Sequence, residues 1–154
     1  MDKYDLVVVG AGPSGYAAAM RSLDFKKKTL LIERNWVGGA GVTNGALSSK
    51  TWWELSRETS AFRRNLKRFN IEAPSVNYQE MRNEVKRAVS ERMSMLEEHM
   101  DLLKTSNYNN LLQFRTGNAK LLSQNKVEIT SGEEKSVVWA DYIILATGSR
   151  PRYL

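Results

Sequence analysis

The sequence contains no cysteine, a single histidine and only three prolines among its 154 residues. Without cysteine, the chain cannot form a disulfide framework, a thiolate metal site or a thiol nucleophile. No apolar stretch approaches the roughly 20 residues that a membrane-spanning helix requires. The first residues lead directly into an apolar run, without the basic and then apolar segments of a secretory signal. These absences predict a cytoplasmic protein with no membrane span and no metal centre.

Charge is present in both signs, with an excess of basic residues. The chain has 23 lysines and arginines against 17 acidic residues, a formal net charge of +6. Much of the excess lies between residues 57 and 92, where glutamates are interspersed, as expected of solvated helix faces. No recognised nucleic-acid-binding module accompanies the charge, which can equally attract an anionic nucleotide. We therefore expect small-molecule nucleotides as partners and no role in nucleic-acid binding.

The strongest motif is glycine-rich. Gly10-Ala11-Gly12-Pro13-Ser14-Gly15 directly follows the apolar run Leu6–Val9. A GxGxxG sequence between a strand and a helix permits a tight turn and lets backbone N–H groups approach a pyrophosphate. Glu33 lies 18 residues after Gly15, at the end of the apolar run Thr29–Ile32, where a carboxylate can accept hydrogen bonds from ribose hydroxyls. The order of these parts predicts dinucleotide binding, and the position of Glu33 disfavours an ordinary glycine-rich turn.

The first two thirds of the chain combine a crossover unit with long helices. We expect a strand at Tyr4–Val9, a helix at Pro13–Asp24 and a strand at Thr29–Glu33. Helical spacing of apolar residues then predicts helices at Lys50–Phe69 and about Tyr78–Thr105. The expected buried positions of the first of these long helices are Trp53, Leu55, Phe62, Leu66 and Phe69. In the second, the methionines are expected to fill the core, and His99 is expected to face solvent because its neighbours are charged.

The last third changes to the period of β-strands. Short strands are predicted at 111–116, 119–123, 126–130 and 136–140, with a polar turn at 131–135. Another continuous apolar run, 142–146, resembles the first strand and is expected to return to the parallel sheet. The predicted fold class is therefore α/β: a Rossmann-like domain whose parallel sheet is interrupted by a crossover β-meander.

Three separated motifs together resemble the class I pyridine nucleotide–disulfide oxidoreductases, a family that includes dihydrolipoamide dehydrogenase and soluble transhydrogenase. The motifs are 9–15 with Glu33-Arg34, Gly38-Gly39 through Ser49-Lys50, and 146–151. The resemblance covers essentially the whole chain. It implies that residues 1–154 are the N-terminal portion of an FAD-binding domain, with NAD(P)-binding and dimerisation domains expected downstream. A genuine small FAD-binding protein is the alternative.

The resemblance also implies roles for individual residues. Lys50 matches the lysine near the flavin N5, where a positive charge would stabilise the reduced, anionic flavin, and it is the implied catalytic residue. The implied cofactor-binding residues are Gly10, Gly12, Pro13, Ser14, Gly15, Glu33, Arg34, Gly39, Lys50, Ala119, Ala146, Thr147 and Gly148. In this reading FAD is the cofactor, NAD(P)H is the co-substrate of the longer protein, and that protein is a homodimer.

One departure from the family pattern changes the expected chemistry. Gly41 and Ala46 stand where the family has its two redox cysteines, and Ser48 replaces a proline. Thiol–disulfide exchange needs a thiolate to attack and a second sulfur to leave. The motif therefore cannot reduce lipoamide or glutathione in the usual way, unless cysteines come from another chain. A flavin can still pass electrons to a second nicotinamide nucleotide, a quinone, dioxygen or a small carrier.

Three functions remain open on these grounds. The preferred one is the FAD-binding part of an NAD(P)H-dependent oxidoreductase without a redox disulfide, similar to a transhydrogenase or diaphorase. The second is a non-catalytic descendant that binds FAD or serves in protein interaction. The third, an NAD-binding dehydrogenase using this unit directly, is disfavoured by the meander and by the segment 146–149.

Overall fold

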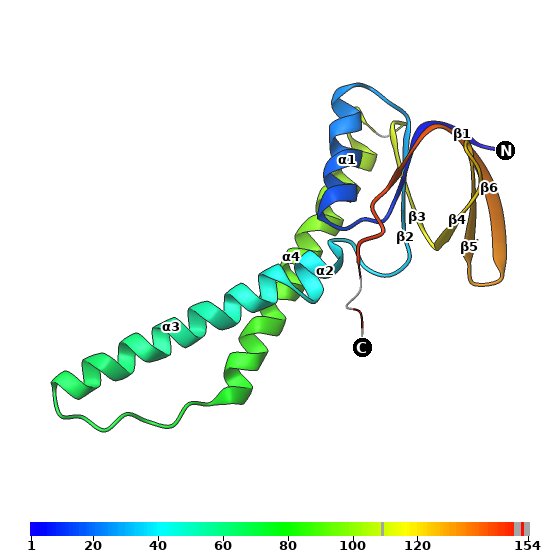
Figure 1. The fold of residues 1–154 in the computed structure, drawn as a ribbon. Coiled ribbons are helices and arrows are strands. Elements are labelled where there is room, and N and C mark those ends of the chain that lie inside the picture. Colours follow the sequence, from blue (N-terminus) through cyan, green and yellow to red (C-terminus); the bar gives the residue numbers. More distant parts are fainter. Residues whose placement is uncertain (109, 150–151, 153–154) are drawn as a thin grey trace.

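The computed structural model describes residues 1–108, 110–149 and 152. A six-stranded sheet in the order β3-β2-β1-β6-β5-β4 forms the body of the molecule. Two long helices project from it as an arm, with the connection between them at the far end (Figure 1). The elements are β1 (Lys3–Val9), α1 (Pro13–Asp24), β2 (Thr29–Glu33), α2 (Gly39–Thr43), α3 (Ala46–Arg68), α4 (Tyr78–Thr105), β3 (Leu112–Thr116), β4 (Asn118–Ser123), β5 (Lys126–Ser131) and β6 (Glu134–Leu145).

The predicted parallel sheet is confirmed, with β1 at its centre. Val7 of β1 lies opposite Leu30 of β2 on one side and Ile143 of β6 on the other, and both pairings are parallel. Strands buried on both faces need continuous apolar runs rather than alternation, which is why the short runs in β1 and β2 form the middle of the sheet. The predicted strand at 111–116 is β3, which also joins this parallel part, beside β2.

The predicted meander is formed by β4, β5 and the first half of β6. The two strands expected at 136–140 and 142–146 are one strand of 12 residues, a correction to the prediction. Its first half pairs antiparallel with β5, and from Trp139 onward it pairs parallel with β1. Asp141 does not interrupt the strand, because an exposed position on an extended chain tolerates a polar side chain. A single strand therefore belongs to both the meander and the parallel sheet.

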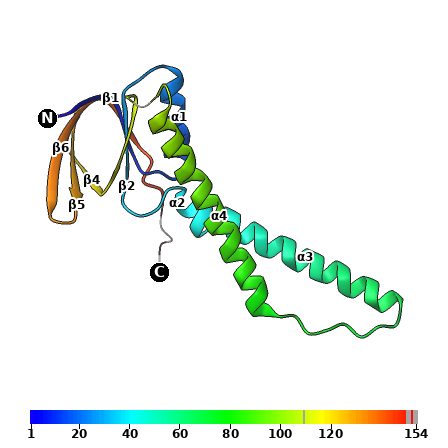
Figure 2. The same cartoon turned by 180° about the vertical axis from the view of Figure 1, so that it is seen from behind.

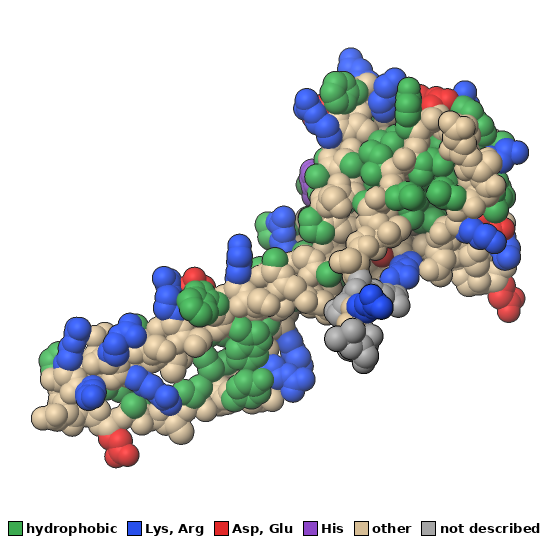
Figure 3. Space-filling model, in the orientation of Figure 1, with side chains coloured by type: hydrophobic (Ala, Val, Ile, Leu, Met, Phe, Trp, Pro, Cys, Tyr) green, Lys and Arg blue, Asp and Glu red, His purple; other side chains and the backbone are tan. Residues whose placement is uncertain are grey.

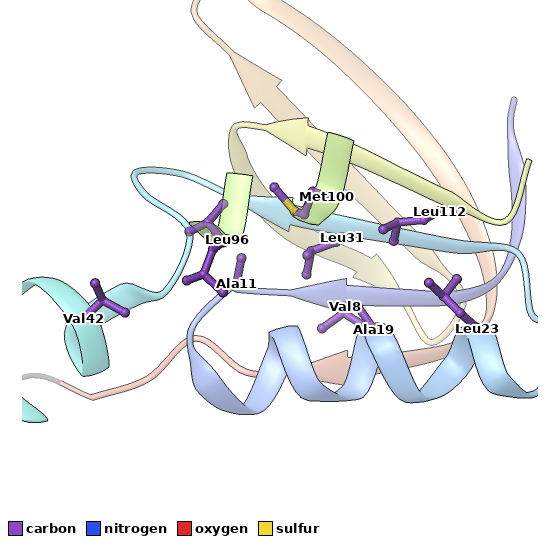
Figure 4. Packing of buried hydrophobic residues seen from close by; sticks show 10 residues of the cluster. Val8, Ala11, Ala19, Leu23, Leu31, Val42, Leu96, Met100 and Leu112 are labelled. Carbon is purple, nitrogen blue, oxygen red and sulfur yellow. The ribbon is translucent and has the colours of Figure 1, made fainter. Parts of the chain in front are cut away.

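Two apolar clusters fill the two faces of the sheet. On one face, Val8 and Leu31 meet Ala19 of α1 and Met100 of α4, as Figure 4 shows. On the other face, Val7 and its neighbours meet the meander, and this cluster consists of Tyr4, Val7, Val9, Leu30, Ile32, Val127, Ile129, Val138 and Ala140. Figure 2 shows α1 and the upper part of α4 on one side of the parallel strands, and the meander half of the sheet on their other side. The core is thus three layers thick around β1 and β2.

The arm departs from the predicted burial. Trp53, Phe62 and Phe69 are 68%, 53% and 74% exposed, so their expected burial was wrong, while Leu55 and Leu66 are half-buried. Helical spacing identifies the face of α3 that turns toward α4, but two helices without a third layer cannot bury large side chains fully. No residue of α3 is buried.

The second helix of the arm is anchored at its sheet end. Its buried residues are Val85, Leu96 and Met100, and the side chain of Asn77 caps its start by accepting a hydrogen bond from the Glu80 N–H at 3.1 Å. The expectation that methionines fill the core therefore holds for Met100, whereas Met95 is 58% exposed. The sheet end of α4 is thus held firmly, and the outer half of the arm is held mainly by contacts between its own two helices.

Candidate functional site

Two glycines of the GxGxxG sequence are required by packing. Gly10 has φ +102°, a conformation that favours glycine, and a Cβ there would lie 2.3 Å from the carbonyl oxygen of Ala146. A Cβ on Gly15 would lie 1.8 Å from the carbonyl oxygen of Gly10. Because these two residues have no Cβ, the start of α1 packs directly against the end of β1. Ala146, whose N–H donates to the Val9 carbonyl at 2.8 Å, lies beside the loop for the same reason.

The third glycine, Gly12, is required by neither packing nor conformation. A Cβ on Gly12 would meet nothing within 4 Å, and Gly12 is the N-cap of α1 without a side-chain cap. Pro13 occupies the first helical position, and within the described part of the chain the N–H groups of Ser14 and Gly15 have no acceptor. The loop thus leaves open space beside free donors at the positive end of a helix, which is an arrangement that fits a phosphate.

Glu33 links the end of β2 to this loop. Its carboxylate accepts hydrogen bonds from the N–H of Ala11 at 2.7 Å and from the N–H groups of Arg34 and Asn35, both at 2.9 Å. A carboxylate has about four acceptor positions, so one remains for a ligand hydroxyl. The N–H of Gly117 donates to the Glu33 carbonyl at 2.8 Å, which brings the start of β4 to the same edge of the sheet.

The glycine-rich segment after β2 packs against the loop from another side. The N–H of Gly38 donates to the Ala11 carbonyl at 2.8 Å, and a Cβ on Gly39 would lie 3.1 Å from the Cα of Gly12. A Cβ on Gly41 would lie 2.6 Å from Cγ of Pro13. The position where the family motif carries its first redox cysteine therefore has no room for a side chain unless Pro13 moves.

The other residues that the sequence predicted for the site do not all lie beside the glycine loop. Ala119 is half-buried in β4, two residues after Gly117. Arg34 and Lys50 are exposed, and in the described part of the chain no ion pair involves either side chain. Thr147 and Gly148 are exposed beyond β6, and Gly148 has φ +73° with open space around it. Arg150 and Pro151 of the third motif lie outside the described residues.

Two contacts at this end of the molecule were not predicted. The Ala11 N–H has no sequence signal of its own, because a backbone donor is independent of residue type. The hydroxyl of Tyr16 and Nδ1 of His99 are 2.5 Å apart, which joins α1 to α4, although His99 is exposed as expected. Burial raises the pKa of the Tyr16 hydroxyl above its usual value, and the charge of Arg92 partly opposes this.

In the part of the chain that the structure describes, no helix has the length and apolar character to cross a membrane, and no cluster of three acidic or histidine side chains is arranged to hold a metal ion. Two surface hollows lie away from the glycine loop, one beside Phe62 and Val76 in the arm and one between Arg115 and Ser136. Neither hollow is lined by a residue of the predicted site.

Comparison with known proteins agrees with this geometry. The family model described as pyridine nucleotide-disulphide oxidoreductase matches residues 4–154. The dihydrolipoyl dehydrogenase of Chlamydia trachomatis is 35% identical over 153 residues, which are 98% of this chain and 31% of that protein. The soluble pyridine nucleotide transhydrogenase of Hahella chejuensis is 28% identical over 153 residues, or 97% of this chain and 31% of that protein.

A solved structure supports the fold independently of sequence. The HOCl-induced flavoprotein disulfide reductase RclA of Escherichia coli, determined as a Cu(II) complex, superposes with a TM-score of 0.78 at 15% identity, covering all of this chain and 30% of that one. The chain thus spans about 31% of the length of the curated relatives named above. On the family match over residues 4–154, this chain belongs to the pyridine nucleotide–disulphide oxidoreductase family and corresponds to its N-terminal, flavin-binding part.

Proposed function

We propose that this chain forms the FAD-binding part of an NAD(P)H-dependent flavoprotein oxidoreductase that works without a redox disulfide. The observation that carries the proposal is the open cradle at Gly12, with free N–H groups of Ser14 and Gly15 beside it and the Glu33 carboxylate linked to it through Ala11. A dinucleotide presents a pyrophosphate and a ribose diol. The N–H groups are complementary to the pyrophosphate, and the Glu33 carboxylate is complementary to the diol.

The residues present fit FAD. The free N–H groups at the start of α1 would bind the pyrophosphate, and the remaining acceptor position of Glu33 would bind a ribose hydroxyl. Ala146, Thr147 and Gly148 follow the strand beside β1, so they share the loop's edge of the sheet and would border the same ligand. Gly39 and Pro13, on α2 and α1, would border it from the opposite side. Arg34 and Ala119 are assigned to the adenosine end by the family resemblance alone.

FAD would supply two-electron chemistry: it accepts a hydride from a nicotinamide and transfers electrons onward. The chain itself offers no sulfur to receive them, since it has no cysteine. Lys50 would place a positive charge toward the reduced flavin and thereby favour its anionic form. A second nicotinamide nucleotide or a small diffusible acceptor is then the electron sink, as in a transhydrogenase or diaphorase. Cytoplasmic location, a homodimer and further domains for NAD(P)H belong to the same proposal.

The first test is ligand choice. Titration calorimetry of the purified protein with FAD, with NAD and with ADP-ribose should show FAD binding at least tenfold tighter than either of the others. Gly12→Ala should weaken FAD binding, whereas Gly132→Ala in the β5–β6 turn should leave it unchanged, because neither Cβ meets protein atoms within 4 Å but only Gly12 lies in the cradle. Tighter binding of NAD than of FAD would revive a direct NAD-binding dehydrogenase.

The second test is reduction. In the full natural protein carrying FAD, anaerobic addition of NADH or NADPH should bleach the flavin's visible absorbance, and an added oxidised nicotinamide analogue or quinone should restore it by accepting the two electrons. A non-catalytic FAD protein is the second candidate, favoured by the closeness of position 41 to Pro13, because a redox side chain would fit at position 41 only if Pro13 moved. It predicts bound FAD whose absorbance responds to neither nucleotide.

A further inference from the structure

The segment 34–38 connects the end of β2 to the start of α2 and is fixed at both of its ends. At its start, the N–H of Asn35 donates to the Glu33 carboxylate at 2.9 Å. At its end, the N–H of Gly38 donates to the Ala11 carbonyl at 2.8 Å. The segment therefore runs from the acid that would bind a ribose to the loop that would bind a pyrophosphate, and backbone donors tie it to both.

Trp36 lies at the middle of this segment and is 57% exposed. The next residue, Val37, is 4% exposed and belongs to the apolar cluster between the sheet and the helices. Because Val37 takes the inward position, the indole of its neighbour lies on the outer side of the segment. The Trp36 carbonyl accepts a hydrogen bond from the N–H of Gly39 at 3.3 Å, which fixes the backbone here. A large ring is thus held at a defined place on the rim of the candidate site.

Among the residues that the structure describes, no aromatic ring packs on Trp36 and no cationic group lies over it. By contrast, Trp52 stacks on Tyr78 with ring centroids 5.3 Å apart, and Nζ of Lys3 lies 4.4 Å from the ring centroid of Trp139. Hydrophobic side chains show at the surface of both the body and the arm (Figure 3), so exposure alone does not identify what contacts a ring. The place of Trp36 between two groups that would hold one ligand does.

The acid determines which half of FAD would lie beside this ring. FAD has its only ribose in the adenosine half, because an open ribityl chain joins its flavin to the phosphates. A ribose bound by Glu33 therefore brings the adenine to the end of β2. Trp36 follows Glu33 by three residues, which span about 10 Å of chain at most. The indole is thus within reach of the adenine, which offers an apolar face on each side of its ring.

We propose that the Trp36 indole stacks on the adenine of bound FAD and gives the site its preference for a flavin that carries adenosine. This inference rests on the proposed function, because it assigns a residue to the adenosine half of the same site. Stacking on a ring that the fold already holds in place needs little further ordering on binding. Trp36 is a positioning residue in this proposal: it holds the adenosine half and does not contact the reacting atoms of the flavin.

A protein surface is the rival contact for this ring, from a further domain of the longer protein or from a second copy. Such a surface would contact Trp36 whether or not a nucleotide is bound. Adenine would contact it only in the complex. The response of the ring to an added nucleotide therefore distinguishes the two.

The first measurement is fluorine magnetic resonance of the full natural protein, freed of FAD and labelled with 5-fluorotryptophan. The Trp36 signal is identified by its absence from the variant Trp36→Phe, and the Trp139 signal is identified in the same way. ADP is the probe, because it has adenosine and two phosphates but no flavin. At concentrations that compete with FAD, ADP should shift the Trp36 signal and leave the Trp139 signal in place. An unshifted Trp36 signal would overturn the proposal.

The second measurement is affinity. Trp36→Ala should weaken FAD binding at least fivefold, whereas Trp36→Phe, which keeps an aromatic face, should stay within threefold of the wild type. Binding of flavin mononucleotide, which has no adenosine, should change less than twofold in both variants. Phe25→Ala is the matched control: Phe25 is 62% exposed at the other end of α1, and its loss should leave FAD binding within twofold.

Unchanged FAD affinity in Trp36→Ala would overturn the proposal, and so would equal losses of affinity for FAD and for flavin mononucleotide. Thermal unfolding without FAD should be the same for Trp36→Ala and the wild type, because more than half of this residue is already exposed. The two proposals fail in different ways. A wild-type protein that binds no FAD contradicts the proposed function, whereas equal FAD binding by the wild type and Trp36→Ala contradicts only the role of Trp36.

Discussion

The carboxylate of Glu33 accepts a hydrogen bond from the Ala11 N–H at 2.7 Å, across 22 residues of sequence. This contact joins the acid at the end of β2 to the turn after β1. Because the fold itself holds the carboxylate through a backbone donor, little further ordering is needed for it to bind a ribose.

Replacing Glu33 by Gln should weaken both the fold and FAD binding. The amide offers one oxygen where the carboxylate offers two, so at least one of the three N–H donors from Ala11, Arg34 and Asn35 loses its acceptor. We expect the free energy of unfolding to fall by about 1–2 kcal/mol and FAD affinity to fall about tenfold. Chemical denaturation and FAD titration measure the two effects. Glu133→Gln, exposed in the β5–β6 turn, is the control and should change neither.

Alanine substitutions at two glycines of the loop should affect fold stability and FAD binding separately. Gly15→Ala places a Cβ 1.8 Å from the Gly10 carbonyl oxygen and should lower the free energy of unfolding by about 3 kcal/mol or more. Gly12→Ala meets no protein atom within 4 Å and should change stability by less than about 0.5 kcal/mol while it weakens FAD binding. Thermal unfolding with and without FAD distinguishes them. Full FAD binding by Gly12→Ala would mean that the ligand does not lie at this cradle.

The contact between position 41 and Pro13 predicts a measurable coupling. Gly41→Ala should lower the free energy of unfolding by about 1–3 kcal/mol, because its Cβ would lie 2.6 Å from Cγ of Pro13. In a Pro13→Ala background, which removes Cγ, the same substitution should cost at least about 1 kcal/mol less. Denaturant unfolding of the four proteins in this double-mutant cycle gives the coupling directly. Additive effects would show that the two residues are not in contact.

Tyr16 should contribute to the alkaline stability limit. Burial raises the pKa of its hydroxyl in the folded state above its ordinary value. Its contribution to stability is therefore complete below the pKa of the unfolded chain, where the hydroxyl is neutral in both states, and is lost as pH rises through the folded-state pKa. Melting temperature measured from neutral to strongly alkaline pH should fall less steeply for Tyr16→Phe than for the wild type. Parallel curves would contradict this assignment, and Tyr4, whose pKa burial also raises, remains in both proteins.

The arm should open more readily than the sheet. α3 has no buried residue, whereas Val7, Val8, Leu30 and Leu31 are fully buried. Each fully buried side chain of this size contributes about 1.5–3 kcal/mol, so the local opening free energy of α3 should be well below that of β1. Hydrogen exchange followed by mass spectrometry should show the outer half of α3 exchanging at least a hundredfold faster than β1. Equal protection would indicate that another protein surface covers the arm in solution.

The sequence predicted the elements whose signals are local. Hydrophobic periodicity, helix-capping residues and the helix breakers glycine and proline predicted the start of α1 at Pro13, the end of β2 at Glu33 and both long helices. The structure places these elements within a few residues of the prediction. The helix expected from Lys50 begins four residues earlier, at Ala46, because helix starts with neither a polar cap nor proline carry little signal. The short helix α2 was not predicted for the same reason, since it lies in a glycine-rich segment and its start has no side-chain cap.

Burial and packing between elements could not be predicted, because they depend on how the helices and strands stack in space rather than on the local sequence pattern. Trp53 and Phe69 have the spacing of core residues, yet no third layer covers α3, and periodicity alone does not report that. The site shows the same limit. The spacing of its glycines and Glu33 was readable, but the contact between Gly41 and Pro13 depends on how α2 packs against α1. The family resemblance identified position 41, and only the three-dimensional arrangement shows that a side chain there would meet Pro13.

The pairing of β1 with β6 has a consequence for the order in which the protein folds. Lys3 lies opposite Trp139, a sequence separation of 136 residues. On a ribosome, β1 would emerge well before β6, and the edge of β1 that pairs with β6 would stay unpaired until β6 had been made. Contacts of such long range form slowly, because the chain between them must be confined before the contact is gained. The loop Gly10–Gly15, which packs against Ala146 just after β6, would therefore take its final shape only once β6 has paired with β1.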